Sequence, residues 1–316
     1  MRIGVDIHGG DFVPHAPIAG AIKAKRQLGE DVTLVLIGSE SLIQAEIQRQ
    51  DADSNQFEIV HTDDFISMKE SPTRGIASKP NASINVGLRM VKENKIDAFI
   101  SAGNTGAMLV GSIMGLGKIE GVNRPTIGVL FPNHHGRLSL ICDVGANVDC
   151  KPETLLHFGI LGSTFMEAVW KVEQPKVALL NIGEEESKGP QVFQQAHKLM
   201  ADNPVIDFIG NVEGRDIYTG EADVLITDGY AGNIVLKFAE SLYDVFSQRM
   251  PNDDAIQTFN FENYGGVPIL GIKGISIIGH GISTGKAFAK MIQTAAEAVE
   301  AGLVEKIEAA FADSNH

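Results

Sequence analysis

Short apolar runs alternate with helical patterns along nearly the whole chain, and this rhythm limits the fold more than any other feature. The apolar runs predict strands at residues 2–6, 32–37, 57–60, 98–101, 126–131, 138–143, 177–182, 205–209, 224–227 and 275–278. The main helices are predicted at 14–28, 39–48 (with Ser39 as cap), 81–93, 105–116, 153–170, 190–200 and from 283 onward. Such alternation is typical of a three-layer α/β/α fold, in which helices cover both faces of a mostly parallel sheet.

Two features modify this simple rhythm. The neighbouring runs 126–131 and 138–143 are separated by Asn133-His134-His135-Gly136, which predicts a hairpin. Residues 63–80 predict a long polar loop. Because the chain contains no Pro- or Ser-rich linker, no low-complexity segment and no clear repeat, we expect a single catalytic unit over residues 1–316, organised as one body or as two interwoven lobes.

Composition excludes several classes of protein. The 316 residues carry a formal net charge of −14 and no basic run, which argues against a general nucleic-acid binder. An acidic partner must therefore dock on a local basic patch. There is no signal-peptide pattern and no apolar run near the roughly 18 residues of a spanning helix, and two cysteines are too few for a disulfide framework. We expect a cytoplasmic protein with reduced thiols.

Gly-rich polar turns that follow predicted strands are the best candidates for a ligand site. Four lead into a helix, at 101–106, 183–189, 228–233 and 279–284, and a fifth spans 143–149. In a parallel sheet such turns gather at the carboxyl edge, where helix N-termini suit phosphate and glycine allows close approach. In the second turn Glu184, Glu185 and Glu186 surround Lys188, and a solvated acidic turn remains an equal alternative. The pattern predicts an enzyme that handles an anion such as phosphate.

Several familiar motifs are absent. The chain has no G-x-G-x-x-G after its first strand, no H-E-x-x-H, no Cys/His cluster at zinc spacing and no G-x-S-x-G. Residues 279–286 resemble a phosphate-binding P-loop but have the wrong spacing. We interpret His134-His135 as a solvated pair, Cys142 as a core residue and Cys150 as a thiol without a paired base. No metal site and no cofactor is expected.

Ordered blocks throughout the chain resemble one known family. The blocks are Val5-Asp6 with Gly9-Gly10-Asp11, 101–106, Arg124-Pro125, 143–149 with Lys151-Pro152-Glu153, 179–189, 208–216, 228–233 with Leu236-Lys237, Tyr264-Gly265-Gly266 and His280-Gly281. Together they resemble the bacterial phosphate acyltransferases of phospholipid synthesis, the acyl-ACP:phosphate acyltransferases of the PlsX family. The resemblance implies an enzyme that converts acyl-ACP and inorganic phosphate to acyl phosphate and free acyl carrier protein (ACP), feeding glycerol-3-phosphate acylation.

The resemblance also implies a fold similar to the isocitrate/isopropylmalate dehydrogenases and the phosphotransacetylases, and a homodimer. Two departures from the family pattern stand out. Ile7-His8 replaces the usual Ala-Met, and the helical insert before Tyr264 is short and polar at 248–254. Since the amphipathic tip of a longer insert suits a bilayer surface, the short insert leaves weak peripheral membrane contact, and an encounter with a downstream membrane acyltransferase, as open questions.

The mechanism that we expect is direct attack of a phosphate oxygen on the acyl thioester, without a covalent enzyme intermediate. Lys188 and His280 are candidate charged partners of phosphate, and Asp228 is a candidate to orient one of them or to take a proton. The candidate phosphate and substrate ligands are Asn104, Thr105, Gly106, Asn147, Asn233, Gly281 and Ser283, with His8 a weaker candidate. The basic residues expected to dock acidic ACP are Arg74, Lys79, Lys118, Arg124 and Arg137.

Two rival interpretations come from other classes of protein. A decarboxylating dehydrogenase on the related fold would need a dinucleotide and a divalent metal, and no nucleotide-binding loop is identifiable in the sequence. A non-catalytic scaffold or binding protein for lipid-synthesis enzymes would have no use for so many polar Gly-rich turns.

Overall fold

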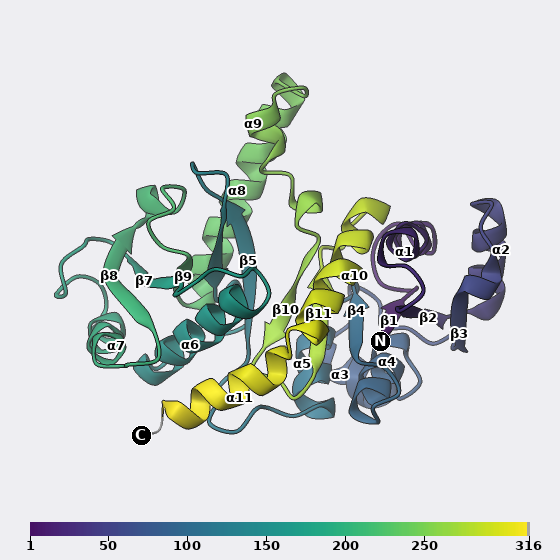
Figure 1. Cartoon of the computed structure of the whole chain (residues 1–316), viewed down its shortest axis with the longest axis horizontal. Helices are drawn as coiled ribbons and strands as arrows, with labels where there is room; N and C mark the ends of the chain where they lie inside the picture. Colours follow the sequence, from purple (N-terminus) through teal and green to yellow (C-terminus); the bar gives the residue numbers. More distant parts are fainter. Residues whose placement is uncertain (315–316) are drawn as a thin grey trace. The chain divides into compact units, whose positions relative to one another are not determined.

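The computed structural model describes residues 1–314, which form two compact units (Figure 1). Unit 1 contains Met1–Gly117 and Phe261–Ala301, and unit 2 contains Lys118–Asn260 together with the residues from Gly302 onward. The chain therefore enters each unit twice. The two units are described separately.

The strands of unit 1 follow the order β3-β2-β1-β4-β11-β10. They are β1 (Arg2–Asp6), β2 (Thr33–Gly38), β3 (Phe57–His61), β4 (Ala98–Ser101), β10 (Gly266–Leu270) and β11 (Ile275–Gly279). All pair in parallel except β10, which is antiparallel to β11. The sequence analysis missed β10, because this short strand includes Gly266 and Pro268, which are both poor strand formers.

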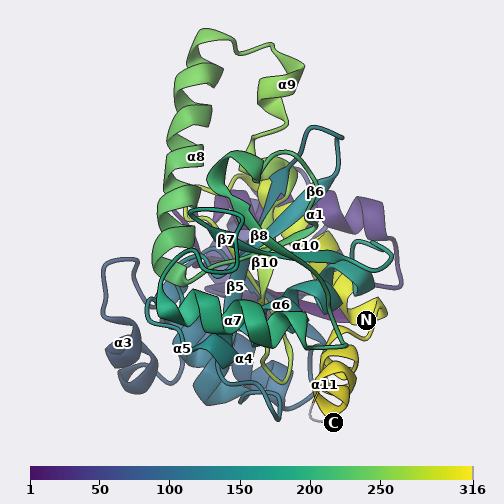
Figure 2. The same cartoon turned by 90° about the vertical axis from the view of Figure 1, so that its left-hand side faces the viewer.

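Helices cover both faces of these strands, as predicted (Figures 1 and 2). On one face α1 (His15–Leu28) packs against α2 (Glu40–Arg49) and α10 (Gly285–Glu300). On the other face α5 (Thr105–Gly115) packs against α3 (Pro72–Ser78) and α4 (Ser83–Lys92). The close approach of α1 to α10 needs a glycine at position 20, because a Cβ there would collide with Phe288.

The strands of unit 2 follow the order β5-β6-β9-β7-β8. They are β5 (Thr126–Pro132), β6 (Leu138–Cys142), β7 (Lys176–Asn181), β8 (Asp207–Glu213) and β9 (Val224–Ile226). β5 and β6 form the predicted antiparallel hairpin, whereas the remaining pairs are parallel. Helix α6 (Pro152–Ala168) packs against α7 (Gln191–Ala201) and α11 (Leu303–Asp313).

The longest helix of unit 2 is α8 (Gly229–Arg249), which extends away from the strands of its own unit (Figures 1 and 2). The short helix α9 (Asp254–Gln257) packs against it. The predicted polar segment 248–254 therefore forms the end of α8 and the turn into α9.

Three local predictions are wrong. Residues 63–80 are not one loop, because α3 lies within them and starts with Pro72, a residue suited to the first turn of a helix. Ser39 precedes α2 as predicted, but its hydroxyl lies 3.4 Å from that of Ser41 and makes no capping bond within the described residues. Most of the predicted turn 228–233 is helix, since α8 begins immediately after Asp228.

Most strands are buried on both faces, which explains their continuous apolar sequences, whereas β3 and β8, the end strands of the two units, are partly exposed. In β2, for example, Leu34, Val35, Leu36 and Ile37 are all fully buried. Within residues 1–314, no helix combines the length and the apolar character needed to cross a membrane.

Candidate active site

Segments that follow four parallel strands of unit 1 lie at the carboxyl edge of those strands. Residues 8–11 follow β1, 62–71 follow β3, 102–104 follow β4 and 280–284 follow β11. The backbone N–H of Asp11 donates to the carbonyl of Gly281 at 2.8 Å, which joins the first and last of these segments. Ligands bind at this edge in α/β sheets, so it is the candidate site of unit 1.

A buried carboxylate organises this edge. Asp6 ends β1 and is 1% exposed; it accepts hydrogen bonds from the hydroxyl of Ser101 at 2.6 Å and from the N–H of His8 at 3.0 Å. The Ser101 hydroxyl in turn accepts from the N–H of Gly103 at 3.0 Å. Burial raises the pKa of Asp6, and hydrogen bonds from Ser101 and Ser83 oppose that shift. Asp6 therefore fixes the loops after β1 and β4 relative to each other.

Asn104 is buried at the N-cap of α5, where its Oδ1 accepts from the N–H of Ala107 at 3.0 Å. Its Nδ2 lies 3.0–3.4 Å from the carbonyl oxygens of Ser67, Met68 and Glu70. Both amide hydrogens thus point at the segment that follows β3. In this structure Asn104 positions that segment, and donation to a substrate would require it to release these contacts.

The next two residues of α5 differ in exposure. Thr105 is exposed, whereas Gly106 lies against Pro72 of α3, so that a Cβ at position 106 would be 2.5 Å from the proline ring. The start of α5 is therefore partly covered by α3.

The start of α10 is less occupied. Thr284 is the N-cap residue, and in the part of the chain that the structure describes no side chain caps this helix. Ser283 is 1% exposed, and its hydroxyl has no hydrogen-bond partner among residues 1–314. Lys286, in the first helical turn, is exposed and donates to Oδ1 of Asn263 at 2.6 Å. Uncapped N–H groups, a hydroxyl and an ammonium group make this turn suitable for an oxyanion.

His280 and Gly281 complete the turn before α10. Nδ1 of His280 lies 3.5 Å from the backbone nitrogen of Ile282, and its ring lies 5.5 Å from that of Phe261. The carboxylate of Asp11 is also close, because a Cβ at Gly281 would be 3.5 Å from its Oδ2. The turn therefore combines potential anion ligands with one nearby acid.

His8 links three segments of unit 1. Its Nε2 lies 3.1 Å from the carbonyl oxygen of Thr62 and 3.3 Å from the backbone nitrogen of Ser39. Its ring stacks on Phe65 with the centroids 5.4 Å apart. These contacts give His8 a role in holding the loops after β1, β2 and β3 together.

The carboxyl edge of unit 2 also contains a buried carboxylate. Asp143 is fully buried and accepts from the hydroxyl of Thr126 at 3.0 Å, from the N–H of Ile127 at 3.1 Å, and from the backbone and side chain of Asn147. Burial raises the pKa of Asp143, although these hydrogen bonds oppose the shift. Nδ2 of Asn147 also donates to the carbonyl of Pro125 at 2.9 Å. The Asn147 amide is therefore engaged within the protein and positions the 143–147 turn.

Asp228 caps the start of α8. Its Oδ1 accepts from the N–H of Ala231 at 2.8 Å, and the N–H of Gly229 donates to the carbonyl of Asn147 at 2.8 Å. Asn233, in the second turn of the helix, is exposed. Asn233 is therefore more accessible to a ligand than Asp228, which is half-buried, or Asn147, which is buried.

The pKa of Cys150 reflects the negative charges at this edge. Burial, followed by the carboxylates of Asp143 and Asp228, raises the pKa of Cys150 to about 12. Burial also raises the pKa of Cys142 well above its ordinary value. Neither thiol has the low pKa that a nucleophilic cysteine needs.

Lys188 lies in the exposed loop after β7. Its side chain is 45% exposed, and Nζ is 3.8 Å from the carboxylate of Glu185. Glu184 faces Arg215 at 3.6 Å. The loop thus combines features of both interpretations left open above, since it is solvated but presents an accessible cation with one loose partner. Lys188 and Asp228 follow neighbouring strands of unit 2, β7 and β9, whereas His280 belongs to unit 1.

The predicted ACP-docking residues have different environments. In unit 1, Arg74 is exposed on α3, while Lys79 donates to Glu70 at 2.7 Å and to the carbonyl of Phe65 at 3.0 Å. In unit 2, Lys118 donates to the carbonyl of Asn123 at 2.8 Å.

Arg124 and Arg137 are exposed at opposite ends of the β5–β6 hairpin. The seven residues of β5 between them span about 24 Å at about 3.4 Å per residue. These two arginines therefore cannot belong to one compact patch.

No group of three or more His, Cys, Asp or Glu side chains within residues 1–314 is arranged to hold a metal ion. The polar groups described above are hydroxyl, amide, imidazole, ammonium and carboxylate groups. They are suited to binding and orienting an anion and a carbonyl group, and to moving a proton.

Comparison with known proteins identifies the family. The family described as "Fatty acid synthesis protein" matches residues 1–253. The phosphate acyltransferase of Syntrophomonas wolfei is 42% identical over 310 residues, which cover 96% of this chain and 97% of that protein. The phosphate acyltransferase of Dictyoglomus thermophilum is 37% identical over 326 residues, covering 97% and 96% of the two chains. The chain belongs to the phosphate acyltransferase family.

Membership makes the chain an acyltransferase that transfers an acyl group with phosphate, in fatty acid and lipid synthesis. Solved structures confirm the predicted fold class. A phosphotransacetylase from Streptococcus pyogenes superposes with a TM-score of 0.67 at 17% identity, covering 95% of this chain and 94% of that one. A 4-hydroxythreonine-4-phosphate dehydrogenase from Klebsiella pneumoniae has a TM-score of 0.55 at 11% identity, covering 94% and 98%. At these identities both show the fold alone.

Sequence reasoning missed two features of the candidate site in this phosphate acyltransferase. The first is the hydrogen bond between Asp6 and Ser101, two polar residues at the ends of predicted strands. Because β1 and β4 are parallel neighbours, their carboxyl ends lie at the same edge of the sheet, and that pairing could have predicted the contact. Lys286 was set aside with the failed P-loop pattern, although a lysine in the first turn of a helix after a Gly-rich loop is itself a signal for anion binding.

Proposed function

We propose that this phosphate acyltransferase converts acyl-ACP and inorganic phosphate to acyl phosphate and free ACP, feeding glycerol-3-phosphate acylation in phospholipid synthesis. The observation that carries the proposal is the similarity, over almost the whole chain, to relatives named phosphate acyltransferase. The polar segments at the carboxyl edges of both units support it, because a scaffold would not need them.

The reaction is a direct displacement at the thioester carbonyl. A phosphate oxygen forms the new C–O bond, the C–S bond breaks, and the sulfur leaves as the thiolate of the ACP arm. Since a thiolate is a good leaving group, orientation and charge neutralisation are the main requirements. Orientation can contribute roughly 7–11 kcal/mol, and one oxyanion donor about 3–4 kcal/mol.

We place phosphate at the start of α10. The supporting observations are the uncapped helix start, the unpartnered buried hydroxyl of Ser283 and the ammonium group of Lys286. The N–H of Gly281 and the imidazole of His280 complete the set of candidate ligands, whereas the N–H of Ser283 already donates to the carbonyl of His280 at 2.9 Å. Asp11, close to Gly281, is placed to accept a proton from phosphate.

Lys188, Asp228 and Asn233 remain the candidates of unit 2. Lys188 offers an accessible positive charge, and Asn233 offers an exposed amide as a donor to the thioester oxygen. One carboxylate oxygen of Asp228 caps α8, which leaves the other to orient a cation or to take a proton. The amides of Asn104 and Asn147 act by positioning, because both are engaged within the protein.

We further propose a homodimer that is formed through α8. This helix exposes large apolar side chains at successive i, i+4 positions, namely Tyr230, Ile234, Phe238, Leu242 and Phe246, and exposed Met250 follows directly after its last residue. Such rows are the ridges that interdigitate when two helices pack, and a second copy presents the same row. Light scattering of the purified protein should give a dimer, and Phe238→Glu should give a monomer. A dimer that is unchanged by this substitution would rule out α8 as the interface.

We place the protein in the cytoplasm. Because the turn at 250–253 between α8 and α9 is short, we predict at most weak membrane contact there, and an encounter with a downstream membrane acyltransferase stays a prediction. Co-sedimentation with anionic phospholipid vesicles checks the membrane prediction.

The activity is tested by incubating the protein with palmitoyl-ACP, with and without inorganic phosphate, and following ACP and acyl phosphate by mass spectrometry. Phosphate-dependent ACP release with stoichiometric acyl phosphate is the expected result. A folded, dimeric protein that gives no turnover would favour the scaffold interpretation instead.

A further inference from the structure

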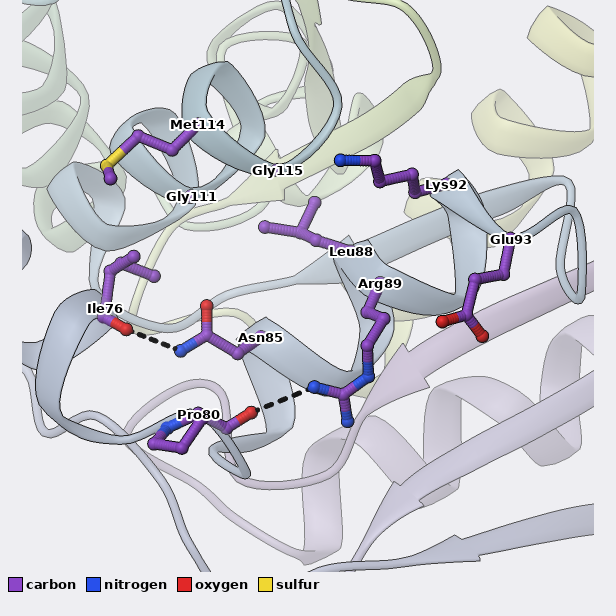
Figure 3. Close-up of a pocket in the computed structure, with 10 residues that line it drawn as sticks. All are labelled: Ile76, Pro80, Asn85, Leu88, Arg89, Lys92, Glu93, Gly111, Met114 and Gly115. Atoms are coloured by element: carbon purple, nitrogen blue, oxygen red, sulfur yellow. Dashed lines mark hydrogen bonds between the residues drawn. The ribbon is translucent and has the colours of Figure 1, made fainter.

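A pocket of about 670 Å³ opens in unit 1 between the C-terminal end of α3, helix α4 and the second half of α5 (Figure 3). It lies outside the candidate site. The residues that line it are Ile76, Pro80, Asn85, Leu88, Arg89, Lys92, Glu93, Gly111, Met114 and Gly115. Nothing in the function proposed so far uses this pocket.

The inner part of the pocket is apolar. Ile76 and Leu88 are buried, whereas Met114 is 65% exposed at the edge of the opening. The glycine at position 111 allows Leu88 and Ile76 to pack closely against α5, since a Cβ there would be 2.8 Å from Leu88 and 2.9 Å from Ile76. Nδ2 of Asn85 donates to the carbonyl of Ile76 at 2.9 Å, which ties α4 to α3. A partner therefore meets a preformed apolar surface.

The rim of the pocket is basic. Arg89 and Lys92 lie one helical turn apart at the end of α4, and both are exposed. Arg89 donates to the carbonyl of Pro80 at 3.1 Å, and Figure 3 shows Lys92 extending over the pocket toward α5. The one acid in the lining, Glu93, forms an ion pair with Lys95 at 2.7 Å. A basic rim is unusual in a chain whose net charge is −14.

We propose that this pocket docks the acyl-carrying partner through an acidic amphipathic helix of that partner. Two neighbouring cations fit acidic side chains on the polar face of such a helix, and the apolar floor fits the large aliphatic side chains on its other face. The inference rests on the proposed function, which supplies an acidic carrier protein as the partner. It replaces the predicted docking set with Arg89, Lys92 and Met114.

The pocket is separated from the candidate site by a distance that suits a substrate on a flexible arm. Asn104, the N-cap residue of α5, lies in the candidate site, and the helix reaches the pocket wall at Gly111 and Met114. At about 1.5 Å per residue, the ten residues from 104 to 114 correspond to about 15 Å. Docking at this pocket therefore leaves the carboxyl edge open to the thioester.

The test is the equilibrium binding of fluorescently labelled holo-ACP to the full-length protein, followed by anisotropy. Arg89→Glu/Lys92→Glu should raise Kd at least about tenfold, since two attractive charges become repulsive. Added salt should weaken the binding of the wild type and should not weaken that of this variant. Met114→Asp tests the apolar edge of the opening and should weaken binding severalfold.

The matched control is Lys23→Glu/Arg26→Glu. These two cations are also exposed, are also one turn apart, and also lie near the C-terminal end of a helix, α1. The control has the same net charge and the same helix-dipole penalty as the rim variant. Because it retains Arg89 and Lys92, its Kd should remain within about twofold of the wild type. Thermal unfolding of each variant verifies the fold, and Lys92→Glu alone is the substitute if the double variant does not fold.

Equal Kd values for the rim and control variants would overturn the proposal, as would a wild type that does not bind ACP. The proposed function is read separately, by phosphate-dependent cleavage of palmitoyl-CoA and palmitoyl-ACP. Binding that depends on the rim, without any turnover, would support the docking site and contradict the activity. Turnover together with binding that does not depend on the rim would support the activity and contradict the docking site.

Discussion

Two helices that follow a strand through a short turn, α8 in unit 2 and α10 in unit 1, differ in how the N–H groups at their starts are satisfied. At α8 the carboxylate of Asp228 accepts from the N–H of Ala231, and the buried carboxylate of Asp143 is close enough to help raise the pKa of Cys150. At α10 no side chain within the described residues caps the helix, and Lys286 adds a positive charge in the first turn.

This difference shows why a Gly-rich turn before a helix does not by itself identify an anion site. A helix start binds phosphate when its N–H groups and partial positive charge are available, and a carboxylate cap uses both. The start of α8 is neutralised by its own sequence, whereas the start of α10 retains this capacity. The four similar turns in the sequence therefore have different chemistry.

The largest effect is expected from making α10 resemble α8. Thr284→Asp supplies a carboxylate cap, which should stabilise the helix by up to about 1 kcal/mol and raise KM for phosphate by about thirtyfold or more, because the new charge repels the anion. Phosphate titration of acyl phosphate formation, with thermal unfolding, measures both. Thr284→Ser is the control that retains the hydroxyl. A normal KM for phosphate in Thr284→Asp would separate the anion site from this helix.

The next effect tests whether a cation of unit 2 also contributes. Lys188→Ala should lower kcat/KM about tenfold while stability stays within about 0.5 kcal/mol, because its exposed ion pair with Glu185 contributes little. Lys188→Arg should recover part of the activity. If Lys188→Ala were as active as the wild type, Lys188 would have no part in neutralising the phosphate charge, and the α10 turn alone would do so.

Asp228 has two roles that substitution can separate. Asn is as good an N-cap as Asp, so Asp228→Asn should preserve the melting temperature and lower kcat several-fold if the second carboxylate oxygen takes part in the reaction. Asp228→Ala should lower both, with about 1 kcal/mol lost from the cap. Full activity in the Asn variant would reduce Asp228 to a cap.

The smallest effect probes the electrostatic potential at the start of α8. With a pKa of about 12, Cys150 has about one thiolate in ten thousand molecules at pH 8, so alkylation by iodoacetamide should be very slow and should rise steeply only in strong base. Asp228→Asn removes one of the carboxylates that raise this pKa and should therefore accelerate alkylation at pH 9. Peptide mass spectrometry distinguishes Cys150 from the buried Cys142. An unchanged rate would show that the field of Asp228 does not reach Cys150.

The sequence predicted most strands to within two residues, because strands buried on both faces have continuous apolar sequences, as in 98–101. The sequence could not predict which groups the side-chain amide of Asn104 contacts. An amide at a helix start fits either a substrate or a neighbouring loop, and only the tertiary arrangement directs it to residues 67–70. For the same reason α3 was missed, since its stability comes from packing against α5 and not from an apolar pattern of its own.

The comparison of the two helix starts is tested most directly by a crystal structure of the protein soaked in tungstate, a phosphate analogue located by its anomalous scattering. We expect one tungstate at the start of α10, in contact with Ser283 and Lys286. Tungstate at the start of α8 beside Asp228, with the α10 turn empty, would contradict it.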